Sequence, residues 1–427
     1  MLVFFTNLIP FATDKEILIP EKLPGPEFTK IEKSLFKSIL YFFIKLAISN
    51  TNISFLIRLV CNFLIKNLLS FFNAIKLFSP VQSITKKSLI IFLLFIFISA
   101  ESSSVSDNIK DNGVIVLMYH RFNENKYPST NIKLSDFIKQ IDLIKKNGFD
   151  FLDADNFEDS LKNQKNQKKI LLTIDDAFMS FYDQAWPILK NDKIPFILFV
   201  NTREIGSNGY MTWSQIREIS KEKFVHIGNH SYSHNYLVDK SNNEIKNDID
   251  LAIEDLKKNL GYNSPFFSYP FGEYSNNFKK IIKNLDFKYA FGQHSGVADE
   301  TKDFYELPRF SINEKYGEIK RFELILKTVP LKYKSIIPSE KYINSKTNPP
   351  VVTIEFFENI KNIKLLNCYA NELNSWKKSK IEYLDDFKIK IKLTGKFTTE
   401  RGRINCSLRE PDGSWRWLGM QFVVAEY

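Results

Sequence analysis

Six short apolar runs, each followed at once by polar residues, divide the chain between residues 113 and 310. They are VIVLMYH (114–120), KILLTIDDAF (169–178), IPFILFVNT (194–202), FVHIGNH (224–230), PFFSYPFG (265–272) and FKYAFGQH (287–294). Nearly continuous apolar runs of this length predict parallel strands that are buried on both faces. Amphipathic helical patterns lie between them, as at 134–148 and 242–261, and each of these two ends at a glycine. The alternation of strands and helices predicts an α/β fold.

The polar residues at the ends of the runs favour one α/β architecture over another. Functional residues that collect at the carboxyl ends of successive strands are typical of a (β/α) barrel. A doubly wound open sheet is the alternative, but nothing in the chain resembles the glycine-rich phosphate loop of that fold. We therefore expect a (β/α) barrel as the catalytic domain, over residues 105–330.

Two of these strand ends carry residues suited to binding a metal. Three of the five histidines, His226, His230 and His234, lie within nine positions. The spacing of His230 and His234 places both imidazoles on one face of a helix or helical turn, where they can bind a divalent cation. Asp175 and Asp176 end another run, and adjacent carboxylates are costly to bury without a cation.

The two aspartates are expected to differ in role, because successive side chains of a strand point to opposite faces. One carboxylate and two imidazoles form the three-ligand set of a catalytic zinc site. The other carboxylate is then free to act as a base on water.

Four stretches together resemble the NodB-type polysaccharide deacetylase family: LLTIDDAF, YMTWSQIREI, IGNHSYSH and FSYPFGEYS. The forms LMYHRF and YPFGEY resemble the branch that acts on poly-N-acetylglucosamine-type polymers. The resemblance covers residues ~113–315 and implies a distorted (β/α) barrel.

The resemblance implies a role for each residue of the metal-binding pattern. Asp176, His230 and His234 match the family's metal ligands, and Asp175 matches its catalytic base. The implied cofactor is a divalent metal, zinc in the first place, with nickel, cobalt or manganese as alternatives. The implied reaction is hydrolysis of an acetamide, in which the metal polarises the carbonyl, Asp175 takes a proton, and acetate and a free amine result.

The resemblance also assigns the walls of the groove. Pro270 and Phe271 occupy the positions that line it, and the Phe271 N–H would help to stabilise the oxyanion. Ser268 stands where many members carry an arginine that orients the base. Arg309 in LPRF or Arg121 could substitute for that arginine.

The remaining candidates are two histidines and a tryptophan. The family's late Leu-x-His motif supplies a general acid, and here no histidine follows His294. His294 is therefore the candidate for the acid, with a substrate-side hydrogen bond as the alternative. His120 either lines the groove or makes a structural hydrogen bond. Trp213 either contacts the substrate or, as we favour, packs, and we expect His226 to pack within its strand.

The pattern changes after a proline-bearing connector at residues 329–350. Six short runs of alternating apolar and polar residues predict an antiparallel β-sandwich at 345–427, as an accessory domain for glycan binding or scaffolding. Trp415 and Trp417 share a strand face, and filling the sandwich core is favoured over stacking on sugars. Cys368 and Cys406 form either one disulfide or two buried thiols.

The N-terminal hundred residues have a different composition. From residue 33 to residue 100 there is no Asp or Glu. Residues 86–100 have the form of a signal peptide or membrane anchor, with two lysines before a short apolar core. Residues 1–85 are hydrophobic and basic, and they represent either an over-extended reading frame, which we favour, or membrane-associated interfacial helices. Either reading predicts that the rest of the chain is exported to the periplasm, cell envelope or extracellular space.

Charge does not indicate nucleic acid as a partner. The formal net charge is +10, but the lysines are scattered among acidic residues and no nucleic-acid-binding motif is present. The leading hypothesis is a metal-dependent N-deacetylase whose partner is an N-acetylated polysaccharide. The alternatives are an O-acetyl polysaccharide esterase and a non-catalytic glycan-binding protein on the same fold.

Overall fold

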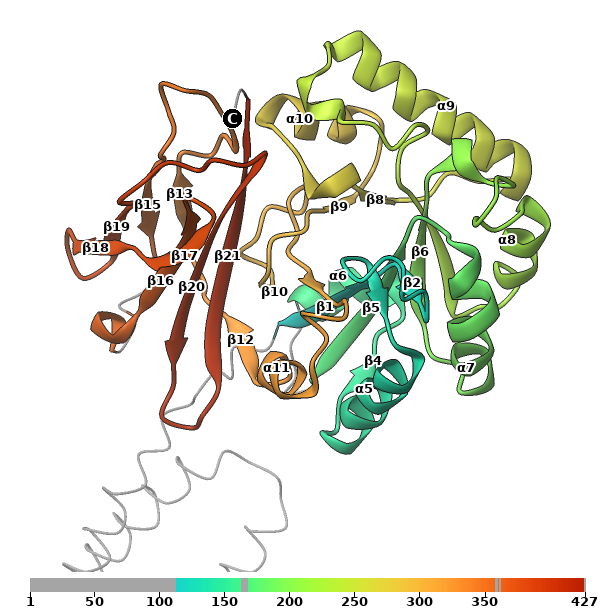
Figure 1. Cartoon of the computed structure of the whole chain (residues 1–427), viewed down its shortest axis with the longest axis horizontal. Helices are drawn as coiled ribbons and strands as arrows, with labels where there is room; N and C mark the ends of the chain where they lie inside the picture. Colours follow the sequence, from blue (N-terminus) through green and yellow to red (C-terminus); the bar gives the residue numbers. More distant parts are fainter. Residues whose placement is uncertain (1–112, 163–167, 358–359, 361, 426–427) are drawn as a thin grey trace, which may run out of the picture. The chain divides into compact units, whose positions relative to one another are not determined.

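The structure, a computed structural model, describes residues 113–425 except 163–167, 358–359 and 361 (Figure 1). These residues belong to one compact unit, Asp107–Tyr427. The predicted signal or anchor at 86–100 and the segment 1–85 lie outside the described residues. Within the described part of the chain, no helix has the length and apolar character that crossing a membrane requires.

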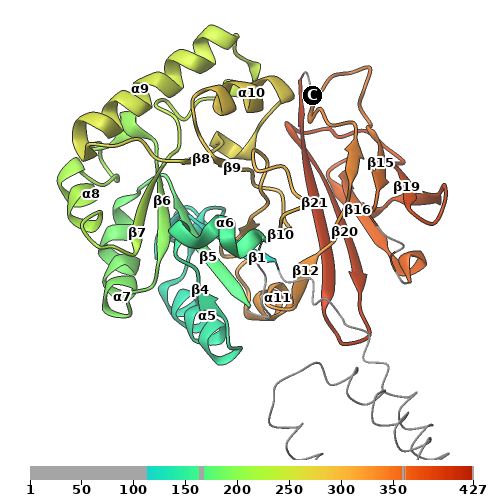
Figure 2. The same ribbon diagram turned by 180° about the vertical axis from the view of Figure 1, so that it is seen from behind.

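A curled parallel sheet forms the first part of this unit (Figures 1 and 2). Its strands pair in the order β1-β5-β6-β7-β8-β9, and each one falls within one of the six apolar runs. The bounds are β1 Val114–Tyr119, β5 Lys169–Asp175, β6 Phe196–Val200, β7 Val225–Asn229, β8 Phe266–Ser268 and β9 Tyr289–Phe291.

Short strands extend the sheet at the β1 side. β10 (Val297–Ala298) pairs antiparallel with β1, and β11 (Phe310–Ser311) pairs parallel with it. β4 (Asp150–Phe151) pairs with β5. An isolated bridge joins Phe291 of β9 to Leu307, so the segment that ends in β11 runs between the two edges of the curled sheet.

The central strands are buried on both faces, as the sequence predicts. Alternate residues of β1 and β5 belong to two separate hydrophobic clusters: Leu117 and Leu172 pack in one, and Val116 and Leu171 in the other. The first cluster includes buried residues of α5 (Leu134–Lys146), α7 (Trp186–Asn191), α8 (Trp213–Ile219) and α11 (Ile319–Ile325). The second includes α6 (Phe157–Lys162). Two-sided burial explains why these runs lack the alternation of a half-exposed strand.

Two further helices follow β7 and β8. α9 (Asn242–Leu260) begins at a capping box between Ser241 and Glu244 and ends at Gly261, whose φ is 85°. A left-handed φ is the conformation that favours glycine at a helix end, which explains the predicted stop. α10 (Asn276–Asn284) follows β8.

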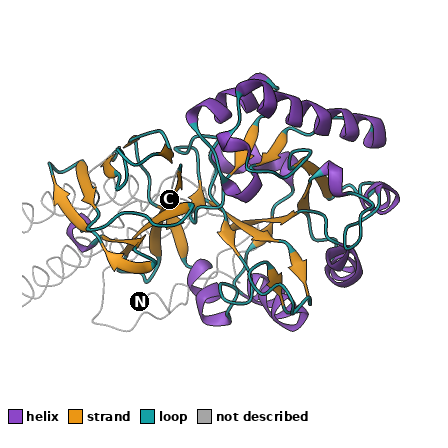
Figure 3. Ribbon diagram, turned by 45° about the horizontal axis from the view of Figure 1, so that its top comes forward, coloured by secondary structure: helices purple, strands orange, loops and turns teal. Residues whose placement is uncertain are grey.

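The C-terminal part consists of two sheets (Figure 3). The larger contains β12 Thr328–Pro330, β14 Tyr342–Ile343, β16 Asn367–Glu372, β17 Ser375–Lys378, β20 Arg401–Arg409 and β21 Trp415–Val424. The smaller contains β13 Ser335–Ile337, β15 Val351–Glu355, β18 Lys380–Tyr383 and β19 Lys388–Lys392. Both sheets contribute to one hydrophobic cluster. The pairing is not wholly antiparallel as predicted, because β12 and β14 run parallel to β21.

The structure decides two further points in this region, the state of the two cysteines and the packing of Trp417. Cys368 of β16 and Cys406 of β20 lie opposite each other and form a disulfide. Trp417 does not fill the core between the two sheets. It packs beside Phe310 of the catalytic region, with ring centroids 6.1 Å apart, and its indole N–H donates to Ser295.

Candidate active site

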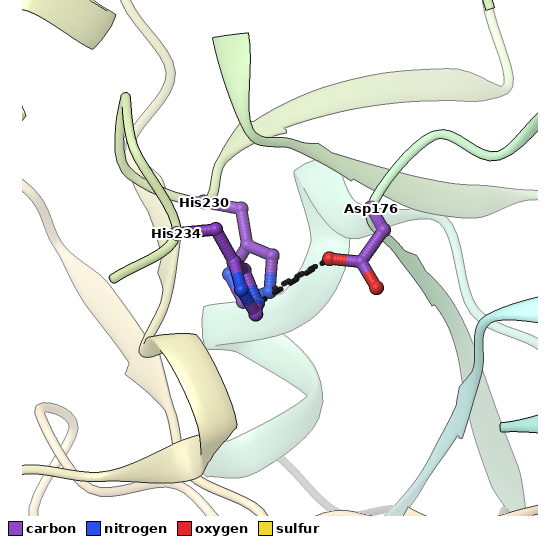
Figure 4. A group of neighbouring side chains, drawn as sticks. All are labelled: Asp176, His230 and His234. Carbon is purple, nitrogen blue, oxygen red and sulfur yellow. Dashed lines mark ion pairs between the residues drawn. The ribbon is translucent and has the colours of Figure 1, made fainter. Parts of the chain in front are cut away.

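Asp176, His230 and His234 come together at the carboxyl ends of β5 and β7 (Figure 4). Asp176 Oδ1 lies 3.6 Å from His230 Nε2 and 3.4 Å from His234 Nε2. Asp176 Oδ1 and His230 Nε2 are both buried, and neither has a hydrogen-bond partner among the described residues. Buried polar atoms without a partner are costly, so this group calls for a ligand that the protein itself does not supply.

A hydrogen bond fixes the protonation of His230. Its Nδ1 lies 2.6 Å from the carbonyl oxygen of Ser268, which can only accept, so Nδ1 carries the proton. The lone pair is then on Nε2, which faces Asp176. Burial lowers the pKa of His230 to about 4, against the raising effect of Asp175, so the ring is neutral at neutral pH. Metal-binding histidines use this neutral form, with the second nitrogen held by a carbonyl or carboxylate.

The spacing of the three ligand atoms fits a small divalent cation. A tetrahedral ion with bonds of about 2.1 Å separates its ligands by about 3.4 Å. The two Asp176–His distances agree with this separation, and the three ligand atoms all lie within 4.8 Å of one another. Figure 4 shows the three side chains converging on one point.

The histidines meet through a loop and not through a helix. The four-residue spacing was expected to act within a helical turn, but residues 230–236 form no helix. Instead the backbone N–H groups of Tyr232 and Ser233 donate to Asp248 on α9, and the N–H of His234 donates to Ser231 Oγ at 3.0 Å. These bonds turn the chain back, so that the His234 ring lies 4.8 Å from that of His230.

Left-handed backbone is concentrated at the site. The φ angles are 76° at Asp176, 55° at Ala177, 67° at Ser231, 52° at His234 and 58° at Phe271. Residues other than glycine occupy this region at a cost, and such residues cluster where a functional geometry is held by its surroundings.

Left-handed backbone also corrects the prediction that Asp175 and Asp176 point to opposite sides. β5 ends at Asp175, and Asp176 leaves the strand with φ 76°. Both carboxylates consequently approach His230 Nε2, at 3.8 Å for Asp175 and 3.6 Å for Asp176. The two carboxylates differ in their other partners, which are Arg309 for Asp175 and His234 for Asp176.

Asp175 is paired with Arg309. Two parallel bonds of 2.8 Å join the guanidinium to the two carboxylate oxygens, and both side chains are fully buried. Ser268 Oγ accepts from Arg309 and donates to Asp175 Oδ2, while Thr173 Oγ1 accepts a further bond from the guanidinium. Burial alone raises the pKa of Asp175, but the charge and hydrogen bonds of the Arg309 guanidinium outweigh it and hold this pKa well below its ordinary value. The carboxylate is therefore ionised and able to accept a proton.

Of the two predicted arginines, Arg309 reaches Asp175 and Arg121 lies elsewhere. Arg121 forms an ion pair with Glu124, and its guanidinium stacks 3.4 Å from the centre of the Phe178 ring. His120, at the end of β1, is influenced by the charges of both aspartates. Burial lowers its pKa, and the charges of Asp175 and Asp176 oppose this shift.

Three other candidates lie apart from the metal-binding group. His294 is buried against Tyr274, and burial, with a smaller effect of Lys341, lowers its pKa to about 3. His226 binds Asp153 at 2.9 Å near the opposite end of β7. Trp213 opens α8 and packs against the first hydrophobic cluster.

Pro270 and Phe271 form a short 3-10 turn after β8. The ring of Phe271 lies 4.6 Å from that of His234, so this turn borders the metal-binding group. Among the described residues, none accepts a hydrogen bond from the Phe271 N–H. A free N–H beside the group is available for a substrate oxygen.

Several contacts of the site had no signal in the sequence. Asp248 anchors the histidine loop, and Thr173 and Ser268 complete the shell around Arg309. Gln421 and Arg401 reach the Phe271 turn from the C-terminal sheets. Asp248, Gln421 and Arg401 stand outside the quoted motifs. Thr173 and Ser268 lie within LLTIDDAF and FSYPFGEYS, but their contacts with Arg309 join segments that are distant in the chain.

Part of this chain is similar to known proteins. Residues 162–290 match a family model described as polysaccharide deacetylase. A poly-beta-1,6-N-acetyl-D-glucosamine N-deacetylase of Staphylococcus aureus is 25% identical over 245 residues, which cover 50% of this chain and 84% of the relative. A solved structure of IcaB from Ammonifex degensii aligns with a TM-score of 0.47 and 25% identity, over 50% of this chain and 97% of that one. Streptococcus pyogenes deacetylase PplD aligns with a TM-score of 0.44 and 24% identity, over 47% and 93%.

Proposed function

We propose, from the premise that this chain is related to the polysaccharide deacetylases, that it is a metal-dependent hydrolase that removes N-acetyl groups from an N-acetylated polysaccharide. The observation that carries the proposal is the convergence of Asp176, His230 and His234 beside the buried Asp175–Arg309 pair. The family match includes all the residues of this arrangement except Arg309.

The residues of the chain have separate tasks in this reaction. A divalent cation, zinc in the first place, would be held by Asp176, His230 and His234 and would act as a Lewis acid on the acetamide carbonyl. Asp175 accepts the proton of the attacking water, and Arg309 orients it and keeps it ionised. The Phe271 N–H donates to the oxygen that gains negative charge. Acetate leaves and the sugar retains a free amine.

His120 is a further titratable group on which the charges of Asp175 and Asp176 act, whereas His294 packs against Tyr274. We therefore assign the proton for the departing amine to His120 rather than to His294.

The polymer and the cellular location are part of the same proposal. The Staphylococcus aureus relative is a deacetylase of poly-beta-1,6-N-acetyl-D-glucosamine. We infer a related N-acetylglucosamine polymer as substrate and an enzyme exported to the cell envelope or beyond. We also infer a distorted (β/α) barrel followed by a β-sandwich of the two C-terminal sheets.

Acetate release from β-1,6-linked N-acetylglucosamine oligomers tests the activity. We expect release by the wild type, loss with a chelator, recovery on adding Zn²⁺, and a fall of at least about a thousandfold in Asp175→Asn that retains its metal. Release from O-acetylated oligomers alone would favour an esterase. Metal binding without acetate release from either substrate would contradict an enzymatic role.

A further inference from the structure

The turn that carries Phe271 is held from outside the catalytic region. Gln421 of β21 is almost fully buried, and its side-chain amide donates to the carbonyl oxygens of Phe271 at 3.1 Å and Gly272 at 3.2 Å. The Oε1 atom of the same amide accepts from Arg403 of β20 at 3.1 Å. Because that bond fixes which end of the amide is the acceptor, both N–H groups face the turn.

A second contact holds the other end of the turn. Arg401 of β20 forms a 2.7 Å ion pair with Glu273, whose side chain is buried. Its guanidinium lies 5.0 Å from the centre of the Phe271 ring and 5.8 Å from that of Tyr236. Tyr236 is 44% exposed and stacks on Phe271, with centroids 4.4 Å apart and planes at 12°.

The hairpin of β20 and β21 is firmly attached to the catalytic region. Ser295 binds both Asn405 and the Trp417 indole, and β12 pairs with β21. A Cβ on Gly419 would lie 2.2 Å from the carbonyl oxygen of Ser295, so the two backbones are in direct contact. The hairpin can therefore serve as a fixed support for the turn.

We propose that the C-terminal hairpin completes the active-site groove, with Gln421 and Arg401 as positioning residues that act through the turn Pro270–Gly272. This inference rests on the proposed deacetylase function. Gln421 sets the direction of the Phe271 N–H by holding the carbonyl oxygens of the two peptide groups that follow it, those of Phe271 and Gly272. Arg401 and Glu273 hold the stacked Phe271 and Tyr236 rings, which form a surface for the sugar beside the metal-binding group.

Two replacements of Gln421 test whether its side chain positions the turn through hydrogen bonds or only fills space. Gln421→Met keeps the length without donors, and Gln421→Glu places a carboxylate against two carbonyl oxygens. We expect each to lower kcat about tenfold with a change in KM below about threefold, since the lost effect concerns the oxyanion donor. Both variants should remain folded, with a metal content within error of the wild type. Arg409→Met, at the far exposed end of β20, is the matched control and should have wild-type kinetics.

The sugar surface has its own variants. Arg401→Met should raise KM about tenfold for oligomers, and Arg401→Lys should restore part of that loss because it keeps a cation beside Glu273. Folded Gln421→Met and Arg401→Met proteins with wild-type kcat and KM would overturn the proposal.

Hydrogen–deuterium exchange of the full chain tests the support without relying on activity. We expect faster exchange of the peptide containing residues 269–274 in Gln421→Met than in Arg409→Met. Equal exchange in both would overturn the positioning role, whatever the kinetics. If the wild type released no acetate, the proposed function would fail, and the exchange experiment alone would decide whether the hairpin holds the turn.

Discussion

Asp175 is bound by Arg309 through two parallel hydrogen bonds, a geometry that a lysine cannot reproduce. Arg309 donates separately to both carboxylate oxygens and also binds Thr173, Ser268 and the Gly292 carbonyl. The planar guanidinium makes these bonds at once, whereas an ammonium group is a compact donor on a flexible stem. Ser268 leaves the space for this partner, which arrives from the segment before β11 rather than from the motif itself.

Replacing Arg309 should damage both activity and stability. We expect Arg309→Lys to lower kcat about 10- to 100-fold, because Asp175 loses its fixed orientation. Arg309→Met should also lower the free energy of unfolding by about 3–5 kcal/mol, because a buried carboxylate is left without its partner. Steady-state kinetics and urea unfolding measure the two effects. Arg121→Met is the control, and an equal loss of kcat there would contradict the assignment.

Glu273 should make stability depend on pH. Burial raises its pKa to about 7, with Arg401 acting in the opposite direction. A folded pKa above the ordinary value of 4.5 means that the contribution is complete below pH 4.5 and is lost as pH rises through 7. Between pH 5 and pH 8 the unfolding free energy of the wild type should fall by about 1–3 kcal/mol relative to Glu273→Gln. Urea unfolding across this range measures it, and parallel curves for the two proteins would contradict it.

At the scale of elements, α9 shapes the loop that carries His230 and His234. Asp248 lies on this helix and accepts from the backbone of Tyr232 and Ser233, between the two histidines. The loop has left-handed φ angles at Ser231 and His234, so it needs bonds of this kind to keep its shape.

Removing the anchor on α9 should weaken metal binding. We expect Asp248→Ala to lower the affinity for Zn²⁺ about 10- to 100-fold, the range seen when partners of metal-ligating groups are lost. Competition titration with a chromophoric chelator measures the affinity. Asp250→Ala on the same helix removes only an exposed pair with Lys246 and should bind as the wild type does. A similar loss in both variants would point to general destabilisation of α9.

At the scale of the whole described unit, the catalytic region and the C-terminal sheets share a close backbone contact. Gly419 of β21 faces Ser295 between β9 and β10, and Gly296 forms a bridge with Leu418. A side chain at position 419 would meet backbone atoms, which cannot move aside as a flexible side chain can.

A methyl group at this contact should separate the two regions. We expect Gly419→Ala to lower the free energy of unfolding by about 1–3 kcal/mol through overpacking. Gly395→Ala is the control, because its nearest neighbours at 3.3 Å are flexible Leu373 side-chain atoms. Urea unfolding of both variants checks the prediction. Equal free energies of unfolding for Gly419→Ala and Gly395→Ala would show that the backbone at Ser295 accommodates the methyl group and would contradict the prediction.

The amino-acid sequence by itself determined the strands, the residues at their ends and the related family. The six apolar runs contain the six central strands. A strand that is buried on both faces is a short continuous run of apolar residues, and such a run can be read directly from the sequence. The family match over residues 162–290 confirms the resemblance indicated by LLTIDDAF and IGNHSYSH, since both motifs lie within it.

Only the tertiary structure decided which distant residues meet. It pairs Asp175 with Arg309, while Arg121 packs on Phe178. It also packs Trp417 beside Phe310. It also brought Gln421 to Phe271, two residues separated by 150 positions in the chain. Such contacts depend on how separate elements pack, and periodicity within one segment carries no record of its partners in space.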